Sequence, residues 1–256
     1  MAILTVQQLV KEYKGKGKEN AFKALNGLNL SVGSGEFVAV MGPSGSGKTT
    51  LLNILSGIDT EYGGNVELAG SSLSGMSKDQ LALFRRQRIG FVFQDYNLLD
   101  SLTLRENVML PLILEGREES DIQAAAAGIL SMLELEAVQD KYPCAVSGGQ
   151  QQRAAIGRAL IHGPDIIFAD EPTGNLDSKS SGNVMRMLSA LNREQQATLV
   201  MVTHDPFAAS YCSRVVFIQD GEISLEITRT QKLSRKAFFD VILENLACIG
   251  GGEDDF

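Results

Sequence analysis

A glycine-rich stretch, "GPSGSGKT" (residues 42–49), has the residue types that bind phosphate groups. It fits the pattern GxxxxGK followed by Ser or Thr, in which glycines let the backbone wrap closely around phosphates. The Lys48 ammonium can neutralise phosphate oxygens, and the Thr49 hydroxyl is a hard oxygen ligand suited to Mg²⁺. We therefore predict a nucleotide site that includes Gly42, Pro43, Ser44, Gly45, Ser46, Gly47, Lys48, Thr49 and Thr50.

Hydrolysis of a nucleotide also needs a carboxylate for the metal and a group that orients water, and "IIFADEP" (residues 166–172) supplies both. Asp170 ends an apolar run, so we expect it at the carboxyl edge of a sheet, where ligands of open α/β folds bind. Glu171 follows directly and is placed to address water rather than metal. The alternative for such an acidic pair is a solvated loop.

The chain has two histidines, and one of them, His204 in "MVTHDP", closes the next apolar run. We expect it at the same sheet edge as the acidic pair. A lone histidine there would more often be structural, but three polar groups that converge favour a catalytic role. His162, in "LIHGPD", has no such neighbours, and we expect it to be a surface loop residue.

A second candidate phosphate contact is "VSGGQQQR" (residues 146–153), where Ser147, Gly148 and Gly149 precede a helical run. Backbone N–H groups at a helix start can point at an anion. The segment has no lysine and no hydroxyl equivalent to Thr49, so it is a poor complete nucleotide site. It is suited instead to cap a phosphate that is already bound elsewhere.

The elements that must position these residues follow from the apolar patterns. "EFVAVM" (residues 36–41) is nearly continuous and typical of a strand buried on both faces, and it leads into the glycine loop. "KTTLLNILSG" (residues 48–57) then has helical spacing with a glycine stop. Residues 78 to about 140 are helical in pattern, interrupted by a strand in "RIGFVFQ". A capping box at "TLRE" (residues 103–106) predicts one helix start, and "ESDIQAAAAGILSMLELE" predicts another helix.

From residue 148 onward, helices alternate with the short apolar runs "DIIFAD", "TLVMVT" and "RVVFIQDG". This alternation indicates a parallel sheet with crossover helices and a helical lobe inserted in an α/β core. The tail, "SRKAFFDVILENLACIGGG", places Phe238, Ile242 and Leu246 at a spacing of four. It predicts an amphipathic helix, ended by three glycines, that packs on its own domain.

Composition limits the classes of function. The chain has 256 residues, 44% of them hydrophobic, and a formal net charge of −8, which argues against a nucleic-acid surface. Cys144, Cys212 and Cys248 have no CxxC spacing and fit reduced thiols. No secretory pattern opens the chain and no apolar run is long enough to span a bilayer. We expect a cytosolic protein whose membrane role comes from a partner.

These motifs, taken in order, resemble the ATP-binding cassette (ABC) family of transporter ATPases, from Tyr13 to about Gly221. Residues 42–49 match the family's Walker A loop, Gln94 in "FVFQDYNLL" its Q-loop glutamine, and "VSGGQ" its signature. The resemblance extends to five more residues: Asp170 as the Walker B aspartate, Glu171 as the catalytic glutamate, Asp177 in "GNLD" as the D-loop, His204 as the switch histidine, and Tyr13 as an aromatic that stacks on adenine.

Two departures are visible: Val146 replaces the signature leucine, and Gly157 interrupts a helix where alanine is common in the family. A glycine there costs about 0.5 to 1 kcal/mol relative to alanine. Close helix packing would explain it, which the sequence alone does not show. The resemblance implies an α/β P-loop NTPase core with a parallel sheet, an N-terminal antiparallel β subdomain and an inserted α-helical lobe. It implies an ATPase domain over residues 1–229, with the lobe at about 78–163, and a C-terminal helix and tail over 230–256.

The family mechanism implies ATP and Mg²⁺ as cofactors and a head-to-tail dimer of two copies. Ser147, Gly148, Gly149 and Gln150 of one copy would then contact ATP held by the other. The resemblance gives catalytic roles to Glu171, His204, Lys48 and Gln94, and a metal site of Thr49, Gln94 and Asp170. ATP would close the dimer, since its γ-phosphate bridges two surfaces, and hydrolysis by in-line attack of water would release it.

Within the family, "ADEPTGNLDS" (residues 169–178) resembles the lipoprotein-release, macrolide-export and cell-division branch. The tail after Ser234 resembles the ATPases of bacitracin-type antimicrobial-peptide resistance transporters. This implies a membrane permease as partner, signalling to a sensor histidine kinase through it, and a place at the cytoplasmic face of the membrane. Residues 94–114, with Leu98 and Leu99, are the expected permease contact; an ordinary lobe-packing loop is the alternative.

Two other readings remain. A cell-division type cassette would act as a nucleotide-gated scaffold without turnover, although Glu171 and His204 favour turnover. A soluble ABC ATPase of DNA repair or translation would carry a long coiled-coil insertion or two cassettes, and neither pattern occurs here.

Overall fold

The computed structural model describes residues 1–14 and 21–250. The last two of the three glycines at the end of the predicted tail helix, residues 251 and 252, lie outside these ranges. Within them, no helix combines the length and the apolar character needed to cross a membrane.

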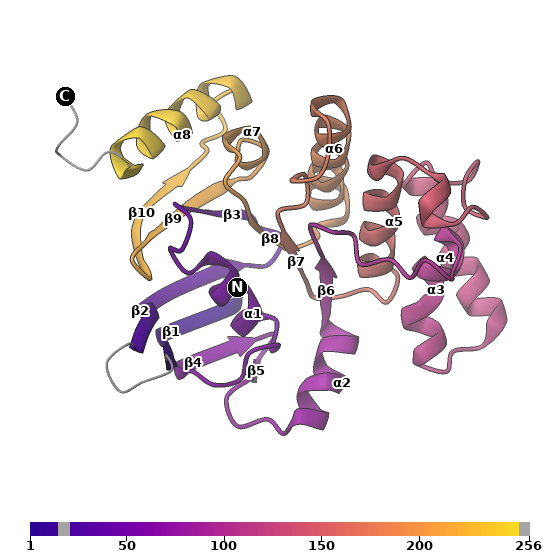
Figure 1. The fold of residues 1–256 in the computed structure, drawn as a ribbon, viewed down its shortest axis with the longest axis horizontal. Coiled ribbons are helices and arrows are strands. Elements are labelled where there is room, and N and C mark those ends of the chain that lie inside the picture. The colour runs from indigo at the N-terminus through magenta and orange to yellow at the C-terminus, as the bar shows by residue number, and fades with distance from the viewer. Residues whose placement is uncertain (15–20, 251–256) are drawn as a thin grey trace.

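The N-terminal part forms a four-stranded antiparallel sheet in the order β2-β1-β4-β5 (Figure 1). This confirms the predicted antiparallel β region. Its strands are β1 (Ala2–Lys14), β2 (Ala21–Gly33), β4 (Gly63–Leu68) and β5 (Ser71–Ser72).

A second sheet has six strands, in the order β10-β9-β3-β8-β7-β6. Five neighbouring strands are parallel, as predicted, while β10 is an antiparallel edge strand that the sequence analysis did not predict. The exposure of β10 alternates from residue to residue, which is typical of an edge strand with one covered face. The strands are β3 (Phe37–Met41), β6 (Ile89–Val92), β7 (Ile166–Asp170), β8 (Leu199–Val202), β9 (Arg214–Gln219) and β10 (Glu222–Thr228).

Three of the helices, α3, α4 and α5, gather at one end of the molecule and form the inserted lobe (Figure 1). The capping box predicted at Thr103 and Glu106 opens α3. Strand β6 falls inside the range predicted for the lobe, yet it pairs with β7 and so belongs to the core sheet. The helices are α1 (Lys48–Leu55), α2 (Lys78–Arg88), α3 (Leu104–Leu114), α4 (Glu119–Met132), α5 (Gly148–Leu160), α6 (Ser178–Gln195), α7 (Pro206–Ala209) and α8 (Arg235–Gly250).

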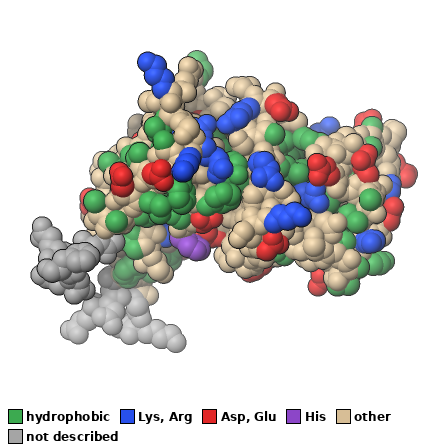
Figure 2. All heavy atoms as spheres, turned by 90° about the horizontal axis from the view of Figure 1, so that it is seen from above, with side chains coloured by type: hydrophobic (Ala, Val, Ile, Leu, Met, Phe, Trp, Pro, Cys, Tyr) green, Lys and Arg blue, Asp and Glu red, His purple; other side chains and the backbone are tan. Residues whose placement is uncertain are grey.

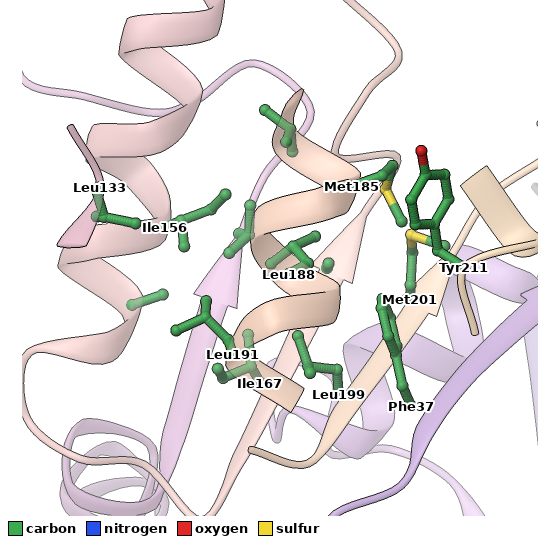
Figure 3. Packing of buried hydrophobic residues seen from close by; sticks show 14 of the residues in the cluster. Phe37, Leu133, Ile156, Ile167, Met185, Leu188, Leu191, Leu199, Met201 and Tyr211 are labelled. Carbon is green, nitrogen blue, oxygen red and sulfur yellow. The ribbon is translucent and has the colours of Figure 1, made fainter. Parts of the chain in front are cut away.

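Strand β3 is apolar along its whole length because both of its faces are buried. Phe37, Ala39 and Met41 point into a core that includes α6, and Figure 3 shows Phe37 near Met201 with the side chains of α6 alongside. Val38 and Val40 point to the opposite face, into a core shared with α1 and the N-terminal sheet. The strand that carries the glycine loop is thus held from both sides.

The C-terminal helix α8 packs on its own domain, as predicted. Phe238 and Ile242 are fully buried in the same core as Phe37, and Leu246 is partly buried against it. The prediction for His162 was wrong: this residue is half-buried after α5, with Nε2 3.2 Å from the carbonyl oxygen of Ile89. The turn after α5 packs against the start of β6, which covers the ring, and burial lowers the pKa of His162.

Gly157 lies where α5 meets α3 and α4, and the packing around it is close. A Cβ atom there would lie 2.8 Å from Leu133 Cδ1 and 3.1 Å from both Ile129 Cγ2 and Val108 Cγ2. Contacts this short force neighbouring side chains to move.

We therefore expect Gly157→Ala to destabilise the protein by about 1 kcal/mol, because overpacking outweighs the helix propensity gained. Chemical denaturation would measure it. Gly128 in α4 is a matched control, since it is exposed and a Cβ there meets no atom within 4 Å. Gly128→Ala is expected to stabilise by about 0.5 to 1 kcal/mol, and equal behaviour of the two variants would contradict the packing argument.

Candidate nucleotide site

The glycine loop connects β3 to α1 in a conformation that requires glycine at two positions. Gly42 has φ +153° and Gly47 has φ +103°. A Cβ at Gly42 would lie 2.1 Å from the carbonyl oxygen of Ile218, and one at Gly47 would lie 2.4 Å from that of Ala24. No side chain fits at either place, so the loop stays close to the sheet edge at the start of α1, where backbone N–H groups can face an anion.

The polar groups of this loop suit a phosphate. Lys48 Nζ donates to the carbonyl oxygens of Gly42 (3.0 Å) and Pro43 (2.7 Å), so the ammonium is folded over the loop. The Ser46 hydroxyl is buried and has no hydrogen-bond partner among the described residues. An anion at the start of α1 would supply acceptors to these donors and would be favoured by the helix dipole. A pocket lies beside the loop, lined by Phe22, Ala24, Gly45, Gly47, Lys48, Thr49 and Thr50.

The carboxyl edge of the sheet is short of positive charge. Burial lowers the pKa of Lys48, while the nearby Glu171 and Asp170 carboxylates act in the opposite direction. Burial and the charge of Glu171 raise the pKa of Asp170, against the effect of Lys48. Desolvation therefore outweighs attraction for both groups. A divalent cation beside Asp170 would favour the charged form of that carboxylate.

The donor set fits Mg²⁺ bound together with a nucleotide. No group of three or more His, Cys, Asp or Glu residues forms a metal cluster in the described ranges. Mg²⁺ is usually held by one or two carboxylates, waters and the phosphates of the substrate, so Asp170 with the Thr49 hydroxyl satisfies its needs.

The structure brings Glu171 and His204 together. Glu171 Oε1 accepts a hydrogen bond from the backbone N–H of His204 (3.0 Å) and lies 2.7 Å from its Nδ1. Thr203, which the sequence analysis did not select, donates from Oγ1 to Glu171 Oε2 at 3.1 Å. Glu171 has φ +43°, an uncommon backbone conformation for a non-glycine residue. The carboxylate is therefore fixed from three sides beside Asp170.

Gln94 lies against the loop that precedes α6. Its Nε2 lies 3.4 Å from Asn175 Oδ1, and a Cβ at Gly174 would lie 3.0 Å from the same nitrogen. Asn175 Nδ2 in turn donates to the carbonyl oxygen of Gln94 (3.2 Å) and to Asp95 Oδ1 (2.8 Å). Asn175 thus ties residues 94–95 to the segment after Glu171, a link that was not predicted from sequence.

The chain continues after Gln94 through Tyr96 and Asn97, which have φ +59° and +49°. Arg158 of α5 holds this turn: it donates to the carbonyl oxygens of Tyr96, at 2.8 Å, and Asn97. Gln152, also on α5 and fully buried, donates to the carbonyl oxygen of Pro172 at 2.8 Å. Helix α5 is therefore attached both to the loop of Gln94 and to the segment after Glu171.

The start of α5, where an anion contact was predicted, has a helix cap. Ser147 Oγ accepts from the N–H of Gln150, and Gln150 Oε1 accepts from the N–H of Ser147 at 2.9 Å. Gly148 packs under Tyr96, since a Cβ there would lie 2.7 Å from the tyrosine oxygen. None of residues 147–150 lines the pocket beside the glycine loop.

Two other predicted ligand contacts, Asp177 and Tyr13, have hydrogen-bond partners within the chain. Asp177 caps α6, where its carboxylate accepts from the N–H groups of Lys179 (2.9 Å) and Ser180 (3.0 Å); hydrogen bonds from Ser180 lower its pKa. Tyr13 is exposed and its hydroxyl donates to Asp59 Oδ2 at 3.3 Å. Its cross-strand partner Phe22 lines the pocket instead, and the strand register is what places it there.

Comparison with known proteins agrees with this geometry. A family model described as ABC transporter matches residues 25–174. The ABC transporter ATP-binding protein YxdL of Bacillus subtilis is 50% identical over 253 residues, which cover 99% of this chain and 96% of that protein. The bacitracin export ATP-binding protein BceA of Halalkalibacterium halodurans is 46% identical over 255 residues, covering 100% of each.

Among solved structures, the dimeric ATP-binding cassette MJ0796, in a post-hydrolysis state with ADP and Pi, matches with a TM-score of 0.80 and 41% identity. The match covers 89% of this chain and 99% of that one. With the glycine loop, the acidic pair and the α/β core in place, the chain belongs to the ABC transporter family as an ATP-binding and ATP-hydrolysing subunit.

Proposed function

We propose that Glu171 orients the attacking water and accepts its proton, while His204 and Thr203 hold the carboxylate in place. The observation that carries this proposal is the set of three contacts on Glu171, at 2.7, 3.0 and 3.1 Å, beside Asp170 and Lys48. Lys48 neutralises charge on the phosphates. When bound, Mg²⁺ supplies further charge neutralisation, and Thr49, Gln94 and Asp170 would hold it directly or through water.

Glu171→Gln tests the role of the carboxylate, because the amide keeps the shape but cannot accept the proton. We expect ATP binding to persist and kcat to fall by at least about 100-fold. Steady-state phosphate release and nucleotide titration would measure the two quantities. Hydrolysis at the native rate would contradict the proposed role.

We further propose that each ATP is completed by the start of α5 from a second copy of the chain. The pocket beside the glycine loop takes no lining residue from 147–150, while α5 presents a capped helix start that lacks a lysine. A related cassette has been solved as a dimer. One glycine loop and one such helix start per chain then give two sites per dimer.

Ser147→Arg tests this arrangement, because a long charged side chain would block the approach of the second copy. In the Glu171→Gln background we expect ATP to trap a dimer, seen by size-exclusion chromatography, and Ser147→Arg to abolish it while ATP still binds the monomer. Ser147→Thr keeps a capping hydroxyl and is the matched control. A full yield of dimer with Ser147→Arg would contradict the proposal.

We propose a membrane permease as the partner and a groove on the lobe as its docking site. The groove measures about 450 Å³ and lies among α2, β6, α3 and α5. Residues 94–114 contribute only part of its wall, and the remainder comes from segments that sequence reasoning did not select. Its apolar lining includes Phe91, Phe93, Leu110, Pro111 and Leu114, and Arg85, Arg86, Arg158 and His162 add polar groups. An amphipathic segment of the permease with an acidic side chain matches this lining.

We infer that the transporter protects a bacterial cell against peptides of the bacitracin type. The chain would be held at the cytoplasmic face of the membrane by the permease. The permease would also contact a sensor histidine kinase. The support is the similarity over the whole chain to a protein named for bacitracin export. Lipoprotein release, macrolide export and a nucleotide-gated scaffold are the alternatives, and the Glu171–His204 contact favours turnover over a scaffold.

Leu114→Glu tests the docking groove. The permease recovered with the wild-type chain from native membranes identifies the partner. Leu114 is 61% exposed, so we expect the fold and ATP binding to survive while recovery of permease from native membranes falls about tenfold. Leu243→Glu on α8, at a residue that is 43% exposed, is the control. Leu98 is a poor probe because it packs against the core. Wild-type recovery with Leu114→Glu would contradict the groove, and a permease without a large extracytoplasmic domain would contradict the peptide-resistance proposal.

A further inference from the structure

The C-terminal helix α8 packs next to the segment that follows His204. Helix α8 lies against α7, the short helix that follows His204 in sequence (Figure 1). Phe238 and Ile242 of α8 are buried in one core with Ala208 and Tyr211. Seen from above, the face near these helices also carries several Lys and Arg side chains beside hydrophobic ones (Figure 2).

Arg235, the first residue of α8, forms the most specific part of this contact. Its guanidinium carbon lies 4.4 Å from the centroid of the Tyr211 ring and 5.3 Å from that of Phe207. Its Nη1 is 3.4 Å from Ser210 Oγ. The two rings meet edge to face, with centroids 5.4 Å apart and an interplanar angle of 75°. One cation thus contacts two aromatic rings, Phe207 within α7 and Tyr211 in the turn that follows it.

Helix α7 needs such support, because a helix of four residues is not stable by itself. Asp205 caps it, accepting from the N–H of Phe207 at 2.8 Å, and the N–H of Asp205 donates to Thr203 Oγ1 at 3.0 Å. Thr203 Oγ1 is the group that donates to Glu171 Oε2. A continuous set of contacts therefore runs from Arg235 through Phe207 and Asp205 to the Glu171 carboxylate.

Phe207 also connects this support to α6. A Cβ at Gly182 of α6 would lie 3.9 Å from the tip of the Phe207 ring, so the ring lies between α6 and Arg235. Asp177, at the start of α6, belongs to the segment that contacts Gln94 through Asn175. The orientation of α7 thus depends on α8 on one side and on α6 on the other.

We propose that Arg235 is a positioning residue for ATP hydrolysis: it fixes α7 and thereby the angle at which His204 and Thr203 present Glu171 to the reacting water. This inference rests on the proposed role of Glu171. It assigns to the C-terminal helix a task in catalysis that is separate from nucleotide binding, since none of its residues lines the pocket beside the glycine loop.

The test compares Arg235→Gln, Arg235→Lys and Lys236→Gln in the chain purified with its permease. Lys236 is the next residue of the same helix, is exposed and carries the same charge, so it controls for charge and for helix stability. We expect Arg235→Gln to lower kcat about threefold to tenfold with an unchanged KM for ATP. Arg235→Lys keeps a cation over the rings and should retain at least about half of the wild-type kcat.

A kcat for Arg235→Gln equal to that of Lys236→Gln would overturn the proposal. A parallel change in kcat and KM, or a failure of Arg235→Lys to restore kcat, would also overturn it, because it would indicate a general structural role. Glu171→Gln measured in the same complex separates the two proposals. If it retains turnover, the role of Glu171 fails, and if it abolishes turnover while Arg235→Gln has no effect, only the role of Arg235 fails.

Discussion

Desolvated charge at the carboxyl edge of the parallel sheet is the constraint around which the rest of the molecule is arranged. Asp170 and Glu171 stand there with Lys48, and burial opposes ionisation of both Asp170 and Lys48. A buried carboxylate or ammonium group remains charged only where the backbone holds an oppositely charged or hydrogen-bonding partner close to it. The buried strand β3 and its glycine loop bring Lys48 to this edge, and the φ of Glu171 turns its carboxylate toward Thr203 and His204.

The lobe is attached to that edge by few but directional contacts. Gln152 and Arg158 of α5 reach the carbonyl oxygens of Pro172, Tyr96 and Asn97. Since these carbonyl groups belong to the segments that carry Glu171 and Gln94, a rotation of α5 cannot leave the carboxylate and the glutamine unaffected. At Gly157, α5 packs closely against side chains of α3 and of the region around the end of α4.

Several features of the fold were predictable because they depend on local chemistry. The glycine loop, the acidic pair after an apolar strand, the capping box at Thr103 and the four-residue spacing of Phe238 and Ile242 each involve residues close in sequence. Close packing at Gly157 was not predictable in this way, because a costly glycine inside a helix does not by itself show what surrounds it. The structure supplied its neighbours Leu133, Ile129 and Val108. The alternating edge strand β10 was missed although its pattern is present, and His162 was misplaced because its cover comes from β6.

The sequence by itself determined which residues could do chemistry and the order of strands and helices, because spacing and residue type control local conformation. Only the tertiary structure decided which of them meet: Thr203 and His204 on Glu171, Asn175 on Gln94, and Phe22 rather than Tyr13 on the pocket wall. Strand register and helix packing join residues that are far apart in the chain, and no local pattern encodes those distances. The contact between Arg235 and α7 is of the same kind.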